Sequence, residues 1–316
     1  MSDWYTLGVD LGSTTAKAVI SDSDGRLVAG EVVQMGAVSR EGVRRAIDAV
    51  LERSGLTEAD IVRTISTGYG RKLVPGADKS YTEITCHARG AVALRPGVEL
   101  VIDIGGQDSK AIAIASDGLV DKFAMNDRCA SGTGRFFDVL ARALEVDITE
   151  VSDLALSGTE DLQVSSMCAT FAETEVISLL AEGAEKADIA ASVHRSVASR
   201  TLGLVSQVGK RKQVVMTGGV AKNAALVGFL SEALGTPIEL LDEPQLAGAY
   251  GAALLARDEY ASDLVRDDAD AETERQMAQS FASITPHCAD CDGHLDGPVR
   301  AVALGLPAVG HPVAAL

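Results

Sequence analysis

Two cysteines, Cys129 and Cys168, each come just before a stretch whose apolar residues recur at helical spacing. After Cys129 a short turn of small residues leads to Phe136, Phe137 and Leu140, which share one face of the predicted helix. The N-terminus of a helix carries partial positive charge and favours an anion, such as a thiolate or a cluster held by thiolates. Two cysteines that each precede a helix therefore indicate an anchor for a metal cofactor.

A second kind of chemistry is indicated by an internal repeat of carboxylates and small residues. Residues 10–17 (DLGSTTAK) resemble residues 103–110 (DIGGQDSK), and an Asp-Gly pair follows each stretch in the same register. The offset is 93 positions throughout, from Asp10 and Asp103 to the two Asp-Gly pairs. A repeat of this length indicates a duplicated lobe rather than a solenoid unit.

Each copy of the repeat is typical of a strand, a polar turn and a second strand. Glycine and serine in such turns let backbone N–H groups approach a phosphate closely. The carboxylates of Asp10 and Asp103 would then hold Mg²⁺ through waters, because Mg²⁺ takes few protein carboxylates besides phosphate oxygens. One such hairpin alone is more often an ordinary turn. Two in register favour a nucleotide cleft between two lobes.

A third glycine element supports this interpretation. A predicted strand at residues 213–217 runs into Gly218 and Gly219, and a helix is predicted over residues 224–234. This arrangement lets backbone approach a flat ligand beside a helix N-terminus. It is not the Walker pattern, in which the glycine-rich loop ends in Gly-Lys-Ser/Thr.

The remaining pattern supplies the elements that position these turns. In the first third of the chain, alternating and periodic apolar residues predict strands at 5–10, 16–20, 26–33 and 61–66 and a helix at 41–54. Near the other end they predict a strand at 237–241 and a small-residue helix at 244–253.

Composition sets further limits. The chain has 316 residues, of which 47% are apolar and 23% are charged, as in a globular protein with two lobes of about 150 residues each. The net charge of −17 argues against binding of nucleic acid or an anionic membrane. No basic-then-apolar stretch near Met1 predicts a secretory leader, and no apolar run approaches transmembrane length. Five cysteines without a leader predict a cytoplasmic protein with free thiols.

The motifs together resemble a known family. Residues 10–15, 103–108 and 217–220 look like the two phosphate motifs and the adenosine motif of the actin/sugar-kinase/Hsp70 ATPase superfamily. The narrower resemblance is to ATP-dependent activators of 2-hydroxyacyl-CoA dehydratases and to the ATP-hydrolysing subunits of benzoyl-CoA reductase. It is carried by residues 102–110 (IDIGGQDSK), 125–129 (MNDRC), 131–135 (SGTGR), 171–178 (FAETEVIS) and 194–200 (HRSVASR). It spans the chain from about Leu7 to about Leu255.

The resemblance implies an α/β fold of two ribonuclease H-like lobes with a nucleotide cleft between them. We expect the first lobe to comprise residues 1–97 and 245–262, and the second lobe residues 98–244. Residues 263–316 are expected to form a mobile C-terminal extension.

The resemblance also implies the roles of individual residues. Cys129 and Cys168 match the positions that hold one [4Fe–4S] cluster shared by the two subunits of a homodimer or a pseudo-symmetric heterodimer. Two thiolates per chain agree with this, because a cubane cluster takes four cysteines. Asp10, Asp103 and Gln107 are the candidates for positioning Mg²⁺ and water. Contacts with ATP are expected from Gly12, Ser13, Thr14, Thr15, Lys17, Gly105, Gly106, Asp108, Lys110, Gly218 and Gly219.

The implied function is that of an ATP-hydrolysing iron–sulfur activator, which drives a low-potential electron into a 2-hydroxyacyl-CoA dehydratase. Ferredoxin or flavodoxin would supply the electron, and no nucleic acid or membrane is involved. One alternative is the electron-activating subunit of a benzoyl-CoA reductase. The other is a sugar- or acid-kinase-like phosphotransferase, which leaves Cys129 and Cys168 without a role. The acyl-CoA substrate is not encoded here, because the partner contacts it.

Three further sites have weaker patterns. Cys86 is interpreted as a buried structural residue, and His194 as a satisfied polar or interface residue on a helix. In the tail, Cys288 and Cys291 are flanked by two histidines, but a single C-x-x-C is weak support for a zinc site.

Overall fold

The computed structural model describes residues 4–35, 38–127, 130, 132–162, 164 and 169–283. The chain separates into two compact units, residues 1–265 and residues 266–316. The predicted nucleotide site lies in the first unit, and the fold described below is the fold of that unit.

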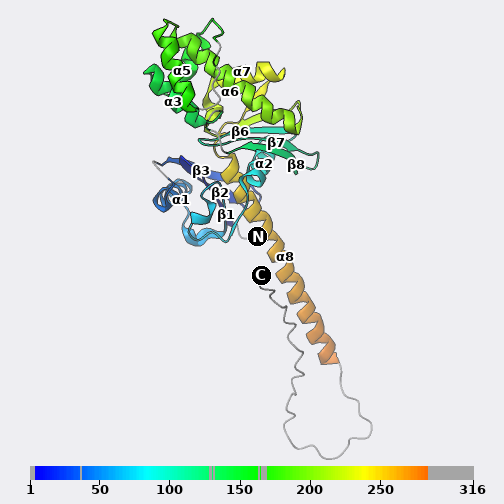
Figure 1. The fold of residues 1–316 in the computed structure, drawn as a ribbon. Coiled ribbons are helices and arrows are strands. Elements are labelled where there is room, and N and C mark those ends of the chain that lie inside the picture. The colour runs from blue at the N-terminus through cyan, green and yellow to red at the C-terminus, as the bar shows by residue number, and fades with distance from the viewer. Residues whose placement is uncertain are drawn as a thin grey trace, which may run out of the picture. The chain divides into compact units, whose positions relative to one another are not determined.

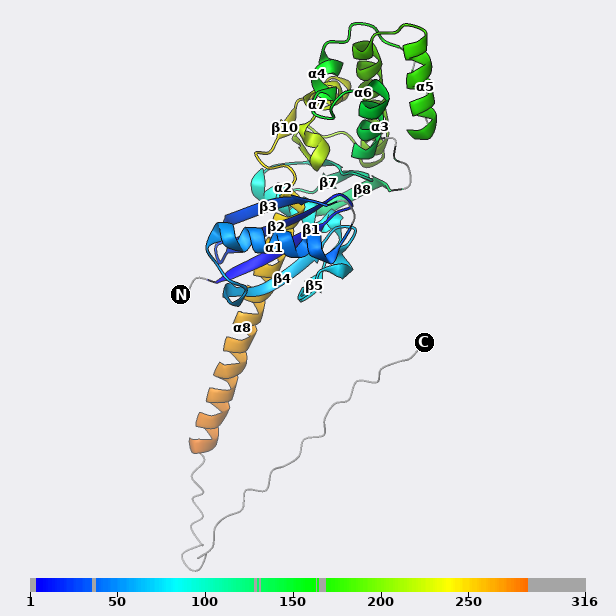
Figure 2. The same ribbon diagram turned by 90° about the vertical axis from the view of Figure 1, so that its left-hand side faces the viewer.

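The first sheet has five strands in the order β3-β2-β1-β4-β5. β1 is antiparallel to β2, and β2 to β3, whereas β4 lies parallel to β1 and to β5. Helix α1 (Arg40–Ser54) lies across one face of this sheet (Figure 2). The strands are β1 (Tyr5–Leu11), β2 (Thr15–Asp22), β3 (Leu27–Gln34), β4 (Ile61–Thr67) and β5 (Lys79–Ser80).

The second sheet repeats this topology with the order β10-β9-β6-β7-β8. β6, β7 and β8 are successively antiparallel, and β9 is parallel to β6 and to β10. β6 therefore corresponds to β1, and β9 to β4. The strands are β6 (Leu100–Ile104), β7 (Ser109–Ile114), β8 (Val120–Asn126), β9 (Val214–Thr217) and β10 (Ile238–Leu240).

Helices cover one face of the second sheet and extend away from it (Figure 1). They are α3 (Gly134–Leu144), α4 (Val151–Leu156), α5 (Ala169–Ala181), α6 (Lys186–Val208) and α7 (Ala224–Leu234). Side chains alternate between the two faces of each strand. Ile102 and Ile104 accordingly pack against these helices, whereas Val101 packs on the opposite face against α2 (Glu83–Leu94).

Each repeat ends in a helix that packs on the sheet of the other repeat. α2 follows the first sheet in the chain but lies on the second, and α8 (Ala247–Ser283) follows the second sheet but packs on β1 and β2 of the first. The two helices approach very closely where they meet, because a methyl group added at Gly251 would lie 1.8 Å from the carbonyl oxygen of Cys86. Glycine is required at this contact.

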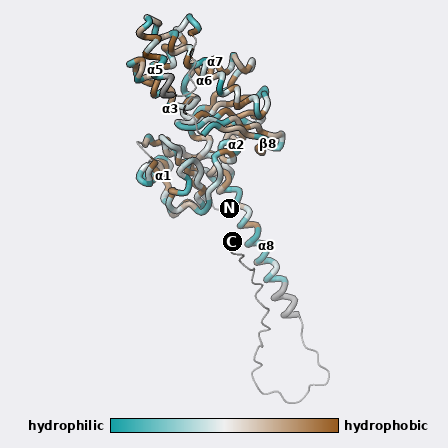
Figure 3. Tube along the Cα trace, viewed as in Figure 1, coloured by the Kyte–Doolittle hydropathy of each residue, from teal (hydrophilic) through white to brown (hydrophobic). Residues whose placement is uncertain are grey.

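The predicted strands and helices of the first unit are confirmed apart from their exact ends, with one larger difference. The helix predicted at 244–253 begins at Ala247 and continues to Ser283. No glycine or proline interrupts the chain from residue 252 to residue 283, and alanine, leucine, arginine and glutamate there favour a helix. Figure 3 shows that the distal part of α8 is mainly hydrophilic, unlike the helices on the second sheet.

The two-lobed fold is confirmed by the duplicated sheets. The boundaries at 97/98, 244/245 and 262/263 stay predictions. In the described part of the chain, no helix combines the length and the apolar character needed to span a bilayer.

Candidate functional site

The turn between β1 and β2 carries the first carboxylate. Asp10 and Lys17 are cross-strand partners, and Lys17 Nζ donates to Asp10 Oδ2 at 3.0 Å. The turn is closed by a hydrogen bond of 3.0 Å from Gly12 N to Thr15 O. The Asp10 side chain is buried and the Lys17 side chain is only 13% exposed, so this ion pair lies at the edge of the protein interior.

The turn between β6 and β7 has the same construction 93 residues later. Asp103 and Lys110 are cross-strand partners with an Nζ–Oδ2 distance of 3.0 Å, and Gly105 N donates to Asp108 O at 2.9 Å. The sequence prediction of two equivalent hairpins is confirmed at the level of individual hydrogen bonds.

A glycine at the end of a neighbouring strand approaches each carboxylate. A methyl group added at Gly68, after β4, would lie 2.3 Å from Asp10 Oδ1. One added at Gly218, after β9, would lie 2.9 Å from Asp103 Oδ1. Both glycines have positive φ, +87° and +85°, so both their conformation and their surroundings exclude other residues. Gly68 was not singled out by the sequence analysis, whereas Gly218 was.

The two turns face each other. A methyl group added at Gly106 would lie 2.9 Å from Thr14 Cγ2 and 3.2 Å from Ser13 Oγ. The predicted phosphate residues of the two lobes therefore come together in one place. Gln107 is exposed at the tip of the second turn, and among the described residues it has no hydrogen-bond partner. It is free to reach a ligand.

Gly219 begins the short 3₁₀ helix Gly219–Lys222, directly after the glycine that approaches Asp103. A methyl group added at Gly219 would lie 3.5 Å from Gln245 Nε2, an ordinary contact. The adenosine role of Gly218 and Gly219 stays a prediction.

Asp103 is the centre of a buried polar network. Its Oδ2 accepts from Lys110, and its Oδ1 accepts from Thr217 Oγ1 at 2.8 Å. His87 Nδ1 lies 3.3 Å from the same Oδ1. Burial alone would raise the pKa of Asp103, but electrostatic interaction with His87 and Lys110 and the hydrogen bonds from Lys110 and Thr217 outweigh it. They hold the pKa of this carboxyl well below its ordinary value.

Lys110 is 1% exposed and contacts three carboxylates. Its Nζ lies 3.0 Å from Asp103, 2.7 Å from Asp108 and 3.6 Å from Glu83. Burial would lower the pKa of Lys110, but the surrounding carboxylates raise it above its ordinary value. The pKa of Glu83 is raised, mainly by its own burial. One buried ammonium therefore neutralises part of a strongly acidic cluster.

The sequence analysis missed three members of this network, namely His87, Glu83 and Thr217. Glu83 and His87 lie four residues apart on α2 and so share a face, but the sequence analysis predicted no helix there. Nothing in the local pattern indicates that this face meets the end of β6, since the contact depends on α2 packing on the second sheet.

The second turn also holds the N-terminus of α3. Gly134 N donates to Gly105 O at 2.8 Å, and Arg135 N donates to Gly106 O at 2.9 Å. Four residues before Thr133, the N-cap of α3, is Cys129, and Cys168 directly precedes α5 in the sequence. Both predicted cluster ligands lie outside the described residues, as do Cys288 and Cys291. The described residues contain no group of three or more potential metal-ligating side chains.

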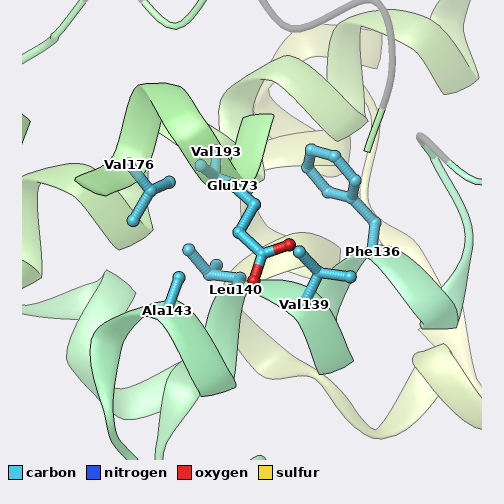
Figure 4. A pocket seen from close by; sticks show the side chains of 7 residues that line it. All are labelled: Phe136, Val139, Leu140, Ala143, Glu173, Val176 and Val193. Atoms are coloured by element: carbon cyan, nitrogen blue, oxygen red, sulfur yellow. The ribbon is translucent and has the colours of Figure 1, made fainter. Parts of the chain in front are cut away.

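Helices α3, α5 and α6 enclose a small apolar pocket (Figure 4). The Glu173 carboxylate of α5 points among side chains such as Phe136 and Leu140 of α3. The two helices that follow the cysteines in sequence therefore pack on each other directly, through an interface that contains one acidic side chain.

Two residues interpreted as structural from the sequence are buried. Cys86 is fully buried, and burial raises the pKa of its thiol to about 12, so it is a poor nucleophile. His194 donates from Nδ1 to Ala190 O at 2.7 Å, and its Nε2 accepts from Asn223 Nδ2 at 2.9 Å. Burial lowers the pKa of His194 to about 4, so its ring is neutral.

Comparison with known proteins agrees with this geometry. The family model of the BadF/BadG/BcrA/BcrD ATPase family matches residues 7–256. The activator of lactoyl-CoA dehydratase from Anaerotignum propionicum is 49% identical over 252 residues, covering 80% of this chain and 97% of that protein. One of the subunits of benzoyl-CoA reductase from Thauera aromatica is 33% identical over 264 residues, covering 79% and 92%.

Solved structures give the same result. The activator of 2-hydroxyisocaproyl-CoA dehydratase from Clostridium difficile with bound ADPNP has a TM-score of 0.78 and 42% identity, covering 83% of this chain and 97% of that one. A ROK family glucokinase from Streptomyces griseus, at 16% identity and a TM-score of 0.50 over 80% and 99% of the two chains, shares the fold alone. The family match, the close relatives and the duplicated carboxylate turns agree, and the chain belongs to the BadF/BadG/BcrA/BcrD ATPase family.

Proposed function

We propose that this protein is an ATP-hydrolysing activator that transfers a low-potential electron to a 2-hydroxyacyl-CoA dehydratase. ATP would lie between the facing turns, with Asp10 and Asp103 on either side. A [4Fe–4S] cluster shared by two copies of the chain would be held by Cys129 and Cys168 of each copy. Ferredoxin or flavodoxin would donate the electron, and the protein would work in the cytoplasm.

The observation that carries the proposal is the direct link between the second turn and α3. Backbone carbonyls of Gly105 and Gly106 accept the hydrogen bonds from the first N–H groups of α3. A phosphate that moves this turn therefore moves the N-terminus of the helix that follows Cys129. Contact of α3 with α5 extends the link to the helix that follows Cys168. Hydrolysis can act on a cofactor held by these cysteines without a covalent intermediate.

The residues of the facing turns suit Mg²⁺ held through water. Both oxygens of Asp103 already accept hydrogen bonds from protein, and Asp10 Oδ2 accepts from Lys17. Carboxylates engaged in this way would contact Mg²⁺ through its bound waters rather than directly. This matches the preference of the ion for retaining waters. The ion would neutralise phosphate charge, and these side chains would orient its waters.

The activator is preferred to its alternatives. Identity to the activator of lactoyl-CoA dehydratase is 49%, against 33% to the protein from benzoyl-CoA reductase. The kinase-like alternative rests on a likeness of fold alone and leaves two cysteines before two helices without a role.

The test is anaerobic purification, followed by iron and sulfide analysis and EPR after dithionite reduction. Wild type should contain about four irons per dimer, and Cys129→Ser and Cys168→Ser should lose them. Cys86→Ser is the matched control, because this thiol is fully buried; it should retain the cluster, and so should Cys288→Ser. ATP hydrolysis without iron, even after reconstitution, would restore the kinase-like interpretation.

A further inference from the structure

His87 is a buried polar residue whose position core packing does not explain. It is 5% exposed, on α2, and it lies where three elements meet: the end of β6, the end of β9 and the beginning of α8. Burying an imidazole is unfavourable unless its nitrogens have partners. The two ring nitrogens face different sides of the site.

On one side, Nδ1 is a donor to the second lobe. It lies 3.3 Å from Asp103 Oδ1 and 3.3 Å from Thr217 Oγ1. The Thr217 hydroxyl already donates its proton to Asp103, and a carboxylate only accepts. Nδ1 must therefore carry a hydrogen, which it donates to Thr217 Oγ1, while Asp103 Oδ1 lies at the same distance of 3.3 Å. His87 thus fixes Asp103 from the side opposite Lys110.

On the other side, Nε2 faces the region beside the first lobe's carboxylate. A methyl group added at Gly248 would lie 2.7 Å from His87 Nε2 and 3.2 Å from Asp10 Oδ2. Both side chains therefore border the same space, which α8 leaves open by having glycine there. Among the described residues Nε2 has no hydrogen-bond partner, although the side chain is more than nine-tenths buried. A buried ring nitrogen of this kind is suited to a ligand or to an ordered water.

We propose that His87 is a positioning residue of the ATPase, which fixes Asp103 through Nδ1 and connects it through Nε2 to the space beside Asp10. It would set the relative position of the two carboxylates and thus the rate of ATP hydrolysis rather than the affinity for ATP. The inference rests on the ATP hydrolysis of the proposed function, and not on the cluster or the dehydratase.

The experiment compares His87→Asn with His87→Gln in steady-state hydrolysis of Mg²⁺–ATP by the full chain. The amide of asparagine reaches about the position of Nδ1 and can donate to Asp103, whereas that of glutamine reaches about the position of Nε2. We expect kcat to fall about tenfold or more in His87→Gln, with KM for ATP changed less than about threefold. His87→Asn should restore much of the loss in kcat.

A double-mutant cycle supplies the second readout and does not depend on the folding of His87→Gln. If His87 acts through Asp103 and Thr217, the kcat losses of His87→Ala, which removes the Nδ1 donor, and of Thr217→Val will fail to multiply when the two are combined. Equal kcat in the asparagine and glutamine variants, a change confined to KM, or losses that multiply would each overturn the proposal. A wild-type protein that does not hydrolyse ATP would instead refute the proposed function.

Discussion

The two hairpin turns have the same backbone and different surroundings. Each joins an aspartate to a cross-strand lysine at 3.0 Å and closes with the same hydrogen bond. Around Asp10 the turn supplies hydroxyl groups, Ser13 and Thr14. Around Asp103 the corresponding region is a buried network in which Lys110 contacts three carboxylates.

This difference indicates that the two turns have different roles in the site. A turn of small hydroxyl residues can adapt to a phosphate, because few of its side chains are committed to protein partners. The second turn is held rigid by ion pairs, and it also holds the N-terminus of α3 through Gly105 and Gly106. Both turns share one backbone conformation. The side chains of α2 and β9 hold only the second turn in a fixed position.

The largest expected effect on the free energy of unfolding is a difference between Lys110 and Lys17. Lys110→Met should lower the free energy of unfolding by about 4 kcal/mol, because it leaves buried carboxylates without their cation. Lys17→Met leaves one buried carboxylate, Asp10, without its partner and should cost less, about 2 kcal/mol. Urea unfolding at pH 7 measures both. Equal losses would show that the buried network is no more important than the simple pair.

Acid should act on the helical part of the second lobe. His194 has its pKa lowered to about 4 by burial, against 6.5 in the unfolded chain. The unfolded state therefore takes up a proton first, so the free energy of unfolding is highest above about pH 6.5 and falls as the pH drops toward 4. By pH 5 the loss due to His194 should be about 2 kcal/mol.

The control for this effect is His194→Gln, which cannot titrate. Urea unfolding of both proteins at pH 7, 6 and 5 isolates the contribution of His194, because acidic residues titrate in both. Parallel curves for wild type and variant would show that the ring is not held neutral.

The threonines at the strand ends allow a finer comparison. Asp10 pairs with Thr67 in the sheet, and Asp103 pairs with Thr217. Thr217 donates to the Asp103 carboxylate, whereas Thr67 donates to the Tyr81 carbonyl at 3.1 Å. Hydrogen bonds to charged groups are the stronger kind, so Thr217→Val should cost about 2 kcal/mol and Thr67→Val about 1. Urea unfolding would contradict this if Thr67→Val were the more damaging.

The sequence predicted the features that the two lobes share. It did not predict the contacts between the two lobes. The constant offset of 93 residues predicted both hairpins and the lobed fold, and it aligned Lys17 with Lys110. It did not predict that these lysines pair with Asp10 and Asp103. It could not place Glu83 and His87 beside Asp103, because that contact arises when α2 packs on the sheet of the other lobe. The continuation of α8 to Ser283 is a different case, because the absence of glycine and proline from residues 252–283 already favours it in the sequence. Contacts between segments distant in the chain depend on tertiary packing, which local patterns do not encode.

The smallest expected effect tests whether equivalent substitutions in the two hairpins lower the free energy of unfolding by the same amount. Gly25 and Gly118 occupy equivalent turns with φ of +83° and +81°, and each donates its N–H to the carbonyl three residues earlier at 2.9 Å. Alanine at either position should cost about 1 kcal/mol, because the left-handed conformation is unfavourable for a residue with a Cβ. Asparagine tolerates this conformation better, so Gly25→Asn and Gly118→Asn should lower the free energy of unfolding less than the alanine variants do.

The two alanine variants should differ slightly. A methyl group would lie 3.2 Å from Leu254 at Gly25 and 3.4 Å from Val92 at Gly118, so Gly25→Ala should cost slightly more. Losses that differ by more than about 1 kcal/mol would mean that the second turn's network rigidifies its whole hairpin, and not only the end that carries Asp103.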